Sequence, residues 1–289
     1  MLVNTKEVLL DAERNNYAVA AFSVYNWETI KAAISAAEKM KCPVILALGE
    51  RYLNYIEIEV FANIVKMMVG KVKVPICLHL DHAYNKTSII SAIKHGFTSV
   101  MYDGSQFSFE ENVQKTKEIV ELSHQTGVSV EAELGSIAKG EHSDEEEGDN
   151  ILTDPMQAVK FIELTNIDFL APAIGTVHGL YVGEPEIDLH RLQSIHNLTS
   201  LPLVLHGGSG TPEKLLIETI NRGIRKININ TEISIAAVTS IQNQLDFSVE
   251  EKRIPHLSLL NERMQMEMMS VMEKYIQLFS NQSKTVFVS

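Results

Sequence analysis

The chain has 289 residues, 45% of them apolar, and a formal net charge of −12, so it can bury a large core in one or two domains. Its negative charge repels nucleic acids and acidic membrane surfaces, and we expect neither as a partner. It holds no run of about 18 apolar residues, so we expect no membrane span. The first residues lack a basic start followed by an apolar core, so we expect no signal peptide. The isolated Cys42 and Cys77 fit a reducing cytoplasm.

Short apolar segments recur along the chain and are typical of buried strands. Most are continuously apolar, as expected for strands that are covered on both faces. In chain order, the candidate strands span residues 19–23, 44–48, 75–80, 98–102, 128–132, 167–171, 202–206 and 225–229.

Helical patterns separate these strands. Asn26 is a good N-cap, Ser108 with Glu111 indicates a capping box, and Pro155 fits a first helical position. The methionine-rich segment near the end predicts a helix that packs against the barrel or a partner subunit. The expected helices span 26–40, 108–127, 154–166 and 257–279, and two more follow Pro212 and Thr231.

Eight strand–helix alternations predict an α/β fold, a (β/α)8 TIM barrel. A doubly wound open sheet is the rival, but no G-x-G-x-x-G follows the first strand. We find no linker, and therefore expect one domain over residues 1–289 with an extra C-terminal helical segment.

Polar residues follow the carboxyl ends of several predicted strands, which is where barrel enzymes place their reactive groups. They include His79, Asp81 and His82 after the third strand, and the motifs "GTVHG", "HGGSG" and "NINT" after the last three. If the barrel forms, His82, His178 and His206 converge on one mouth. Three imidazoles with an open position form the usual ligand set of a catalytic zinc ion, and we interpret His79 as a packing or supporting residue.

The glycine-rich and "NINT" loops predict a phosphate site. Glycines expose backbone amides, and the helix that follows each loop adds its N-terminal donors. The acidic run from Asp144 to Asp149 is expected to be a solvated loop.

Several motifs together resemble the class II, zinc-dependent ketose-bisphosphate aldolases, which include fructose- and tagatose-bisphosphate aldolases. The likeness covers about residues 1–240 and rests on "HLDHA", "GFTSVMYDGS", "VSVEAELGS", "APAIGTVHG", "PLVLHGGSG" and "KININTE". It implies a lyase of carbohydrate metabolism, as in glycolysis, that cleaves fructose or tagatose 1,6-bisphosphate into dihydroxyacetone phosphate and glyceraldehyde 3-phosphate. It also implies a homodimer or homotetramer.

The resemblance assigns roles by position. It implies zinc ligands at His82, His178 and His206, with Glu133 at an alternative metal position. Asp81 matches the residue that shuttles the C4 hydroxyl proton, and Glu141 matches the mobile-loop glutamate that exchanges the C3 proton. The implied phosphate and triose contacts, some shared with a monovalent cation (Na⁺ or K⁺), are Gly179, Gly207, Gly208, Ser209, Asn228, Asn230 and Thr231.

The chemistry of the residues agrees with this assignment. Retro-aldol cleavage leaves an enediolate whose charge needs a preorganised cation. The alternative strategy is a lysine Schiff base, but Lys226 begins the eighth strand, at the opposite rim. A Schiff-base enzyme would be trapped by borohydride and indifferent to chelators.

The chain departs from the family pattern at the aldehyde end. Ser23 and Gly49 replace a usual asparagine and serine, and Ala138–Lys139 replaces a glycine pair. The family arginine for the second phosphate has no clear match, and Arg51 and Arg263 are the candidates. Two alternatives stay open: a ketose 1-phosphate with an uncharged aldehyde end, and a phosphosugar-binding barrel without catalysis.

Overall fold

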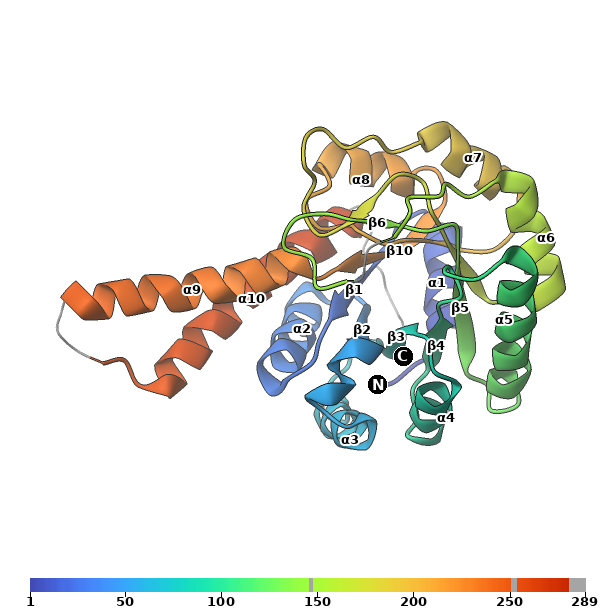
Figure 1. Ribbon diagram of the computed structural model, residues 1–289. Coiled ribbons are helices and arrows are strands. Elements are labelled where there is room, and N and C mark those ends of the chain that lie inside the picture. Colours follow the sequence, from blue (N-terminus) through green and yellow to red (C-terminus); the bar gives the residue numbers. More distant parts are fainter. Residues whose placement is uncertain (146–147, 251–253, 281–289) are drawn as a thin grey trace.

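The predicted barrel is confirmed by the computed structural model, which describes residues 1–145, 148–250 and 254–280 (Figure 1). Parallel strands close in the order β1-β10-β9-β7-β5-β4-β3-β2. They are β1 (Val19–Ser23), β2 (Val44–Gly49), β3 (Ile76–Ala83), β4 (Ser99–Tyr102), β5 (Ser129–Leu134), β7 (Phe169–Pro172), β9 (Leu203–Leu205) and β10 (Ile224–Ile229).

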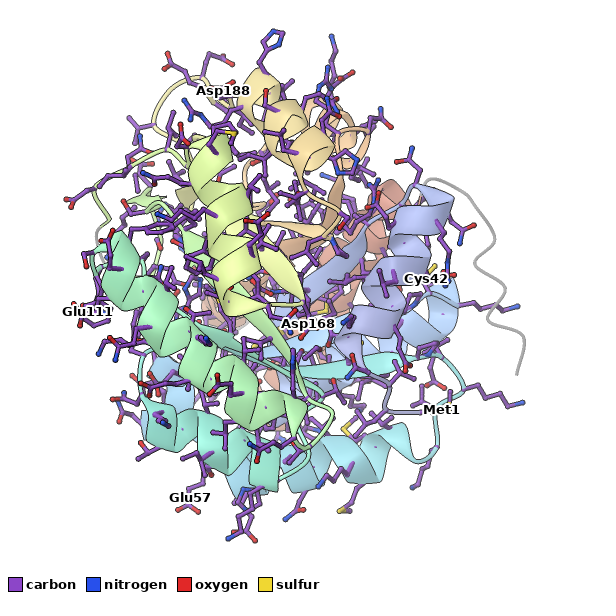
Figure 2. The ribbon with its side chains drawn as sticks, turned by 90° about the vertical axis from the view of Figure 1, so that its right-hand side faces the viewer. Met1, Cys42, Glu57, Glu111, Asp168 and Asp188 are labelled. Carbon is purple, nitrogen blue, oxygen red and sulfur yellow. The ribbon has the colours of Figure 1, made fainter. Side chains whose placement is uncertain are left out.

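Helices cover the outside of the barrel, and α5 and α6 lie side by side on it (Figure 2). Asn26 caps α2 in a reciprocal box with Thr29, Ser108 caps α5 by accepting from the Glu111 N–H, and Pro155 opens α6. The outer helices are α2 (Trp27–Met40), α3 (Ile58–Val69), α4 (Lys86–Lys94), α5 (Phe109–His124), α6 (Pro155–Thr165), α7 (Leu189–Leu198) and α8 (Glu213–Ile220), with the 3₁₀ turn η1 (Glu50–Asn54).

Helix α1 (Thr5–Asn15), which we did not predict, belongs to the core inside the barrel. Its Val8 and Leu9 pack with inward-facing side chains such as Phe169 and Val204. Burial of each such side chain contributes about 2 kcal/mol to the stability of the fold. Helix α1 thereby closes the end of the barrel opposite the site described below.

Helices α9 (Thr231–Glu250) and α10 (Leu257–Phe279) project from the barrel as an arm (Figure 1). The returning part of α10 packs against α2, where Met268 and Met272 are buried, as predicted for the methionine-rich helix. Met266 is exposed. No helix in the described part of the chain combines the length and apolarity that crossing a membrane requires.

A second, two-stranded sheet lies outside the barrel and corrects one expectation. It pairs β6 (Ala138–Lys139) with β8 (Val177–His178), so that Lys139 lies opposite His178. The sixth barrel strand, β7, ends at Pro172. His178 is therefore held by this small sheet and not by the end of a barrel strand.

Candidate active site

Strand β3 delivers two adjacent polar side chains because its regular pattern breaks at Asp81 and His82. Its pairing with β4 shifts register between Leu80 and Ala83, and His82 has φ 44°, in the left-handed region. Neighbouring side chains of a regular strand face opposite sides, whereas a bulge re-aims one of them. Asp81 and His82 are both buried and line the same cavity.

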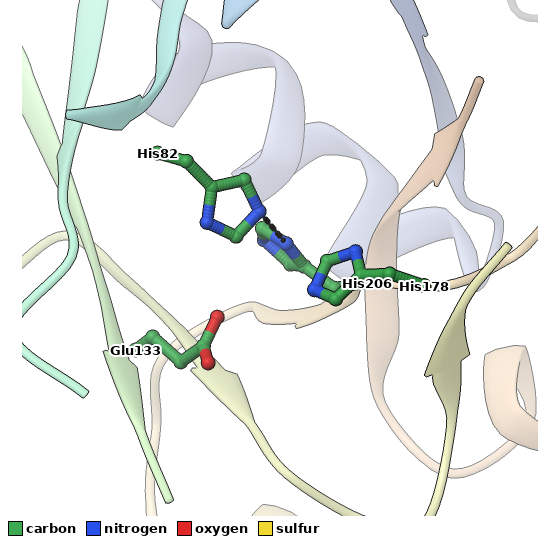
Figure 3. A group of neighbouring side chains, drawn as sticks. All are labelled: His82, Glu133, His178 and His206. Carbon is green, nitrogen blue, oxygen red and sulfur yellow. Dashed lines mark hydrogen bonds between the residues drawn. The ribbon is translucent and has the colours of Figure 1, made fainter. Parts of the chain in front are cut away.

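Three imidazoles and one carboxylate meet above the barrel (Figure 3). His82 comes from β3, Glu133 from β5 and His178 from β8, while His206 follows β9. One potential ligand atom of each residue lies within 4.8 Å of those of the others. The structure thus brings together the four residues predicted to hold zinc.

Hydrogen bonds to two outer carboxylates fix which imidazole nitrogens face inward. His82 donates from Nδ1 to Asp103, and His206 donates from Nε2 to Glu131, each over 2.8 Å. His82 Nε2 and His206 Nδ1 then face each other with lone pairs, only 2.8 Å apart. Two lone pairs that close require a proton or a cation between them, and such outer partners are typical of metal-binding histidines.

Glu133 also fits a bound cation. Its side chain is buried, and its Oε2 lacks a hydrogen-bond partner. Burial, and secondarily the nearby Asp103 carboxylate, raise the pKa of Glu133 well above its usual range. Burial lowers the pKa of His178 to about 3, which leaves a neutral imidazole. Burial lowers the pKa of His82, but the Glu145 carboxylate and the hydrogen bond to Asp103 outweigh burial and raise it to about 10. A metal ion bound between His82 and His206 would take the place of that proton.

Asp81 is held as an ionised carboxylate next to this cluster. Burial raises its pKa, but the Lys226 ammonium and a hydrogen bond with His79 outweigh burial and bring that pKa well below its usual range. Asn228 donates from Nδ2 toward both carboxylate oxygens, each over 3.3 Å. An ionised, oriented carboxylate is a suitable general base.

The predicted phosphate residues line a narrow cavity beside the cluster, about 30 Å³ in volume. Gly207 has φ 69°, and a Cβ there would lie 2.1 Å from the Val177 carbonyl oxygen. Only glycine permits this approach of the two loops. Gly208 does not line the cavity, and its N–H already donates to the Asn228 carbonyl over 3.1 Å, so the prediction of a phosphate contact at Gly208 was wrong. The predicted residues that do line the cavity are Gly179, Gly207, Ser209, Asn228, Asn230 and Thr231.

The expectation of a solvated acidic loop holds for Asp144, which is exposed, but was wrong for Glu145, whose side chain is only 14% exposed; residues 146–147 of this run lie outside the described residues. Asp144 and Glu145 both line the phosphate cavity. Asp144 accepts hydrogen bonds from the Tyr52 hydroxyl over 2.5 Å and from Asn230 over 3.1 Å, and Glu145 pairs with Arg51. Local charge pattern gave no sign of these partners, which come from distant parts of the chain.

Three further candidate residues, Glu141, Arg263 and Arg51, do not line the phosphate cavity. Glu141 is exposed, and its backbone pairs with Leu180 in two hydrogen bonds. Arg263 lines a separate cavity of about 480 Å³ between α9 and α10. Arg51 lies near the mouth, where Glu145 and Asp144 hold its guanidinium.

A wider cavity of about 250 Å³ borders the other side of the cluster. It shares His82, His178 and Glu133 with the metal cluster, and Glu145 with the phosphate cavity. Tyr84, Ser105 and Phe107 form part of its wall. The cluster thus lies between two cavities, with room for substituents on either side of a bound metal.

The expected position of Lys226 needs correction. Its backbone does lie low in β10, opposite Val19 at the start of β1. Its long side chain nevertheless reaches upward, and Nζ lies 2.6 Å from Glu131 and 3.8 Å from Asp81. This amine is fully buried and paired, so it remains unsuited to a Schiff base.

Comparisons with known proteins agree with this site. The family model described as "Fructose-bisphosphate aldolase class-II" matches residues 3–284. The chain belongs to the class II fructose-bisphosphate aldolase family. It is therefore an aldolase, a carbon–carbon lyase of a family that uses zinc, and the cluster of three histidines and Glu133 has the donors to hold that ion.

Curated relatives cover most of the chain. A fructose-bisphosphate aldolase of Staphylococcus aureus is 43% identical over 251 residues, which are 85% of this chain and 86% of that protein. One from Geobacillus stearothermophilus is 42% identical over 250 residues, or 84% and 86% of the two chains.

A solved structure extends the likeness to nearly the full length. The crystal structure of the YdjI aldolase from Escherichia coli K12 has a TM-score of 0.87 and 35% identity. The match covers 98% of this chain and 99% of that one. The family's barrel and the projecting arm of this chain are thus both within the matched region.

Proposed function

We propose that this class II aldolase reversibly cleaves fructose 1,6-bisphosphate to dihydroxyacetone phosphate and glyceraldehyde 3-phosphate. The observation that carries the proposal is the ionised Asp81 beside three imidazoles whose free nitrogens converge. His82, His178 and His206 would hold zinc, and Glu133 supplies an alternative position for it. When bound, the ion supplies positive charge where negative charge develops during cleavage.

The chain's own residues handle binding and proton transfer. Asp81 accepts the C4 hydroxyl proton, and Asn228 keeps its carboxylate oriented. Amides and hydroxyls around the narrow cavity hold the phosphate of the ketose end, namely those of Gly179, Gly207, Ser209, Asn230 and Thr231. The aldehyde portion would occupy the wider cavity.

A substrate panel tests the proposal. Zinc-loaded enzyme is expected to cleave fructose 1,6-bisphosphate faster than tagatose 1,6-bisphosphate or fructose 1-phosphate, and chelation should abolish all turnover. Turnover of the 1-phosphate alone would favour the alternative of an uncharged aldehyde end, which the replacement by Ser23 suggests. A pure binding barrel would leave the C3 protons of dihydroxyacetone phosphate unexchanged.

The loop after β5 contains two candidates for the group that exchanges this C3 proton, the carboxyl groups of Glu141 and Glu145. Glu141 is the proposed one, because its backbone hydrogen bonds to Leu180 place it two residues from the ligand His178 in the neighbouring segment. We expect Glu141→Gln to slow proton exchange by about 10²-fold or more, with zinc affinity unchanged.

Glu145→Gln is the matched variant in the same loop. It frees Arg51 from a carboxylate partner, so we expect a change in KM and nearly normal exchange. Exchange is measured by loss of the C3 deuterium signal. Normal exchange in Glu141→Gln together with lost exchange in Glu145→Gln would transfer the role to Glu145.

We also propose that the arm of α9 and α10 forms the interface of a homodimer or homotetramer. Apolar side chains stand exposed along it, including Val238, Leu245, Phe247, Leu257 and Leu259. Arg263, which lies on this arm, would then be free to reach the second phosphate in a neighbouring subunit, whereas Arg51 is the candidate from the same chain.

Sedimentation velocity tests the assembly. We expect a dimer or tetramer, and a charge placed on the arm by Phe247→Glu should dissociate it. A wild-type monomer at micromolar concentration would contradict the interface. We also propose a location in the cytoplasm, which the free cysteines Cys42 and Cys77 suit.

A further inference from the structure

A buried cation lies beneath the metal cluster. Lys226 has no exposed side-chain surface, and its Nζ lies 2.6 Å from Glu131 Oε2 and 3.8 Å from Asp81 Oδ1. The two carboxylates are themselves buried. A lysine is almost never fully buried unless it is paired, and removing one member of such a group leaves an uncompensated charge.

Lys226 occupies a place that would otherwise suit a second metal. His79, Asp81 and Glu131 offer ligand atoms within 4.8 Å of one another. Nζ lies near all three residues, since it is also 3.4 Å from His79 Nε2. The chain therefore supplies its own positive charge at this position.

One contact of Lys226 leads to the metal ligands. It holds Oε2 of Glu131, while Oε1 of the same carboxylate accepts the Nε2–H of His206 over 2.8 Å. This second hydrogen bond keeps the proton on Nε2 and leaves Nδ1 free for the metal. The lysine, the glutamate and the histidine form a continuous chain of contacts.

The other contact leads to the proposed base. The Asp81 carboxylate has three polar neighbours. Lys226 Nζ lies 3.8 Å from it, Asn228 Nδ2 donates to it over 3.3 Å, and His79 Nε2 lies 3.5 Å away. Two of these neighbours also contact Glu131: His79 Nε2 lies 3.5 Å from its Oε2, and Lys226 makes the shorter contact, a hydrogen bond of 2.6 Å.

We propose that Lys226 is a positioning residue that holds both the metal ligand His206, through Glu131, and the base Asp81. One internal cation thereby sets metal affinity and the geometry of proton transfer together. The second half of this inference rests on the proposed function of Asp81, whereas the first half does not.

Lys226→Met tests the inference in the zinc-loaded enzyme. We expect zinc affinity, measured by competition with a chelator, to fall by about 10- to 100-fold. With zinc at saturation, kcat should still be at least tenfold low while KM stays within a few-fold. The cobalt-substituted enzyme should show an altered d–d absorption spectrum, because His206 loses its fixed orientation.

A double variant separates positioning from simple stabilisation. Lys226→Met with Glu131→Gln removes the charge of Glu131 together with that of Lys226, so that only Asp81 loses its cation, and the glutamine oxygen can still accept from His206. We expect this protein to fold, to regain zinc affinity to within a few-fold of wild type, and to keep a low kcat because Asp81 still lacks its cation. Lys6→Met is the matched control, since Lys6 also pairs with a buried aspartate, Asp168, but is half exposed. It should change none of these quantities.

Wild-type zinc affinity and kcat in folded Lys226→Met would overturn the inference, as would full kcat in the double variant. Should no variant, nor the wild type, cleave any bisphosphate, the proposed function fails. Zinc affinity and the cobalt spectrum would still decide the part of the inference that concerns His206.

Discussion

Replacing His206 by alanine is expected to remove catalytic zinc and to reduce kcat/KM by about 10³-fold or more. His206 is buried, and its Nδ1 lies 2.8 Å from Nε2 of His82 inside the ligand cluster. A bound cation contributes several kcal/mol of charge stabilisation in the transition state, and each 1.36 kcal/mol is a tenfold rate. The measurements are zinc content after dialysis and steady-state cleavage kinetics.

His190→Ala provides the control for this prediction. His190 is exposed at the start of α7 and does not belong to the metal-ligand cluster. It should retain one zinc ion per chain and full activity. Tight stoichiometric zinc binding and normal cleavage in His206→Ala would show that the ion is held elsewhere.

Replacing Asp81 by asparagine is expected to lower kcat by 10²- to 10⁴-fold, the usual contribution of a general base. The substitution removes the negative charge while preserving the size of the side chain, so zinc affinity should stay within a few-fold. The pKa of Asp81 lies well below its usual range, so this base should not lose its charge as pH falls from 7 to 5. Cleavage rates and zinc affinity, measured on the same preparation, check both parts.

Asp103→Asn is the reciprocal variant. Asp103 is also a buried aspartate, but it accepts a hydrogen bond from the ligand His82. Its loss should weaken zinc affinity by about 10- to 100-fold and leave kcat close to normal once zinc is saturating. The proposed division of roles is wrong if Asp103→Asn loses kcat at saturating zinc and Asp81→Asn does not.

The sequence was sufficient to locate the barrel and most of the metal site. Strands that are buried on both faces form long apolar runs, and each predicted strand overlaps an observed one within a few residues. His82 lies at the carboxyl end of one such strand and His206 directly follows another. Because these ends meet in any closed parallel barrel, convergence of the two histidines follows from topology.

His178 was assigned correctly to the cluster but with the wrong local structure. A two-residue strand such as β8 leaves no periodic signal, and its partner β6 lies in a distant segment of the chain. Pairing of this kind is decided by tertiary contacts. The sequence alone therefore predicted His178 in a loop at the end of the sixth barrel strand.

Long charged side chains account for two other errors. The backbone of Lys226 was correctly placed at the lower end of its strand, but its four-carbon stem carries the ammonium to Asp81 and Glu131. Glu145 belongs to an acidic run that locally resembles a solvated loop. Its partners, Arg51 and His178, are far away in sequence, so local charge pattern held no sign of them.

The most direct test of the whole account is anomalous diffraction at the zinc edge from crystals of the zinc-loaded protein. We predict one strong peak per chain, within coordination distance of nitrogen atoms of His82, His178 and His206. A peak away from these rings, or rings too far apart to share one ion, would contradict the metal site and the proposed function built on it.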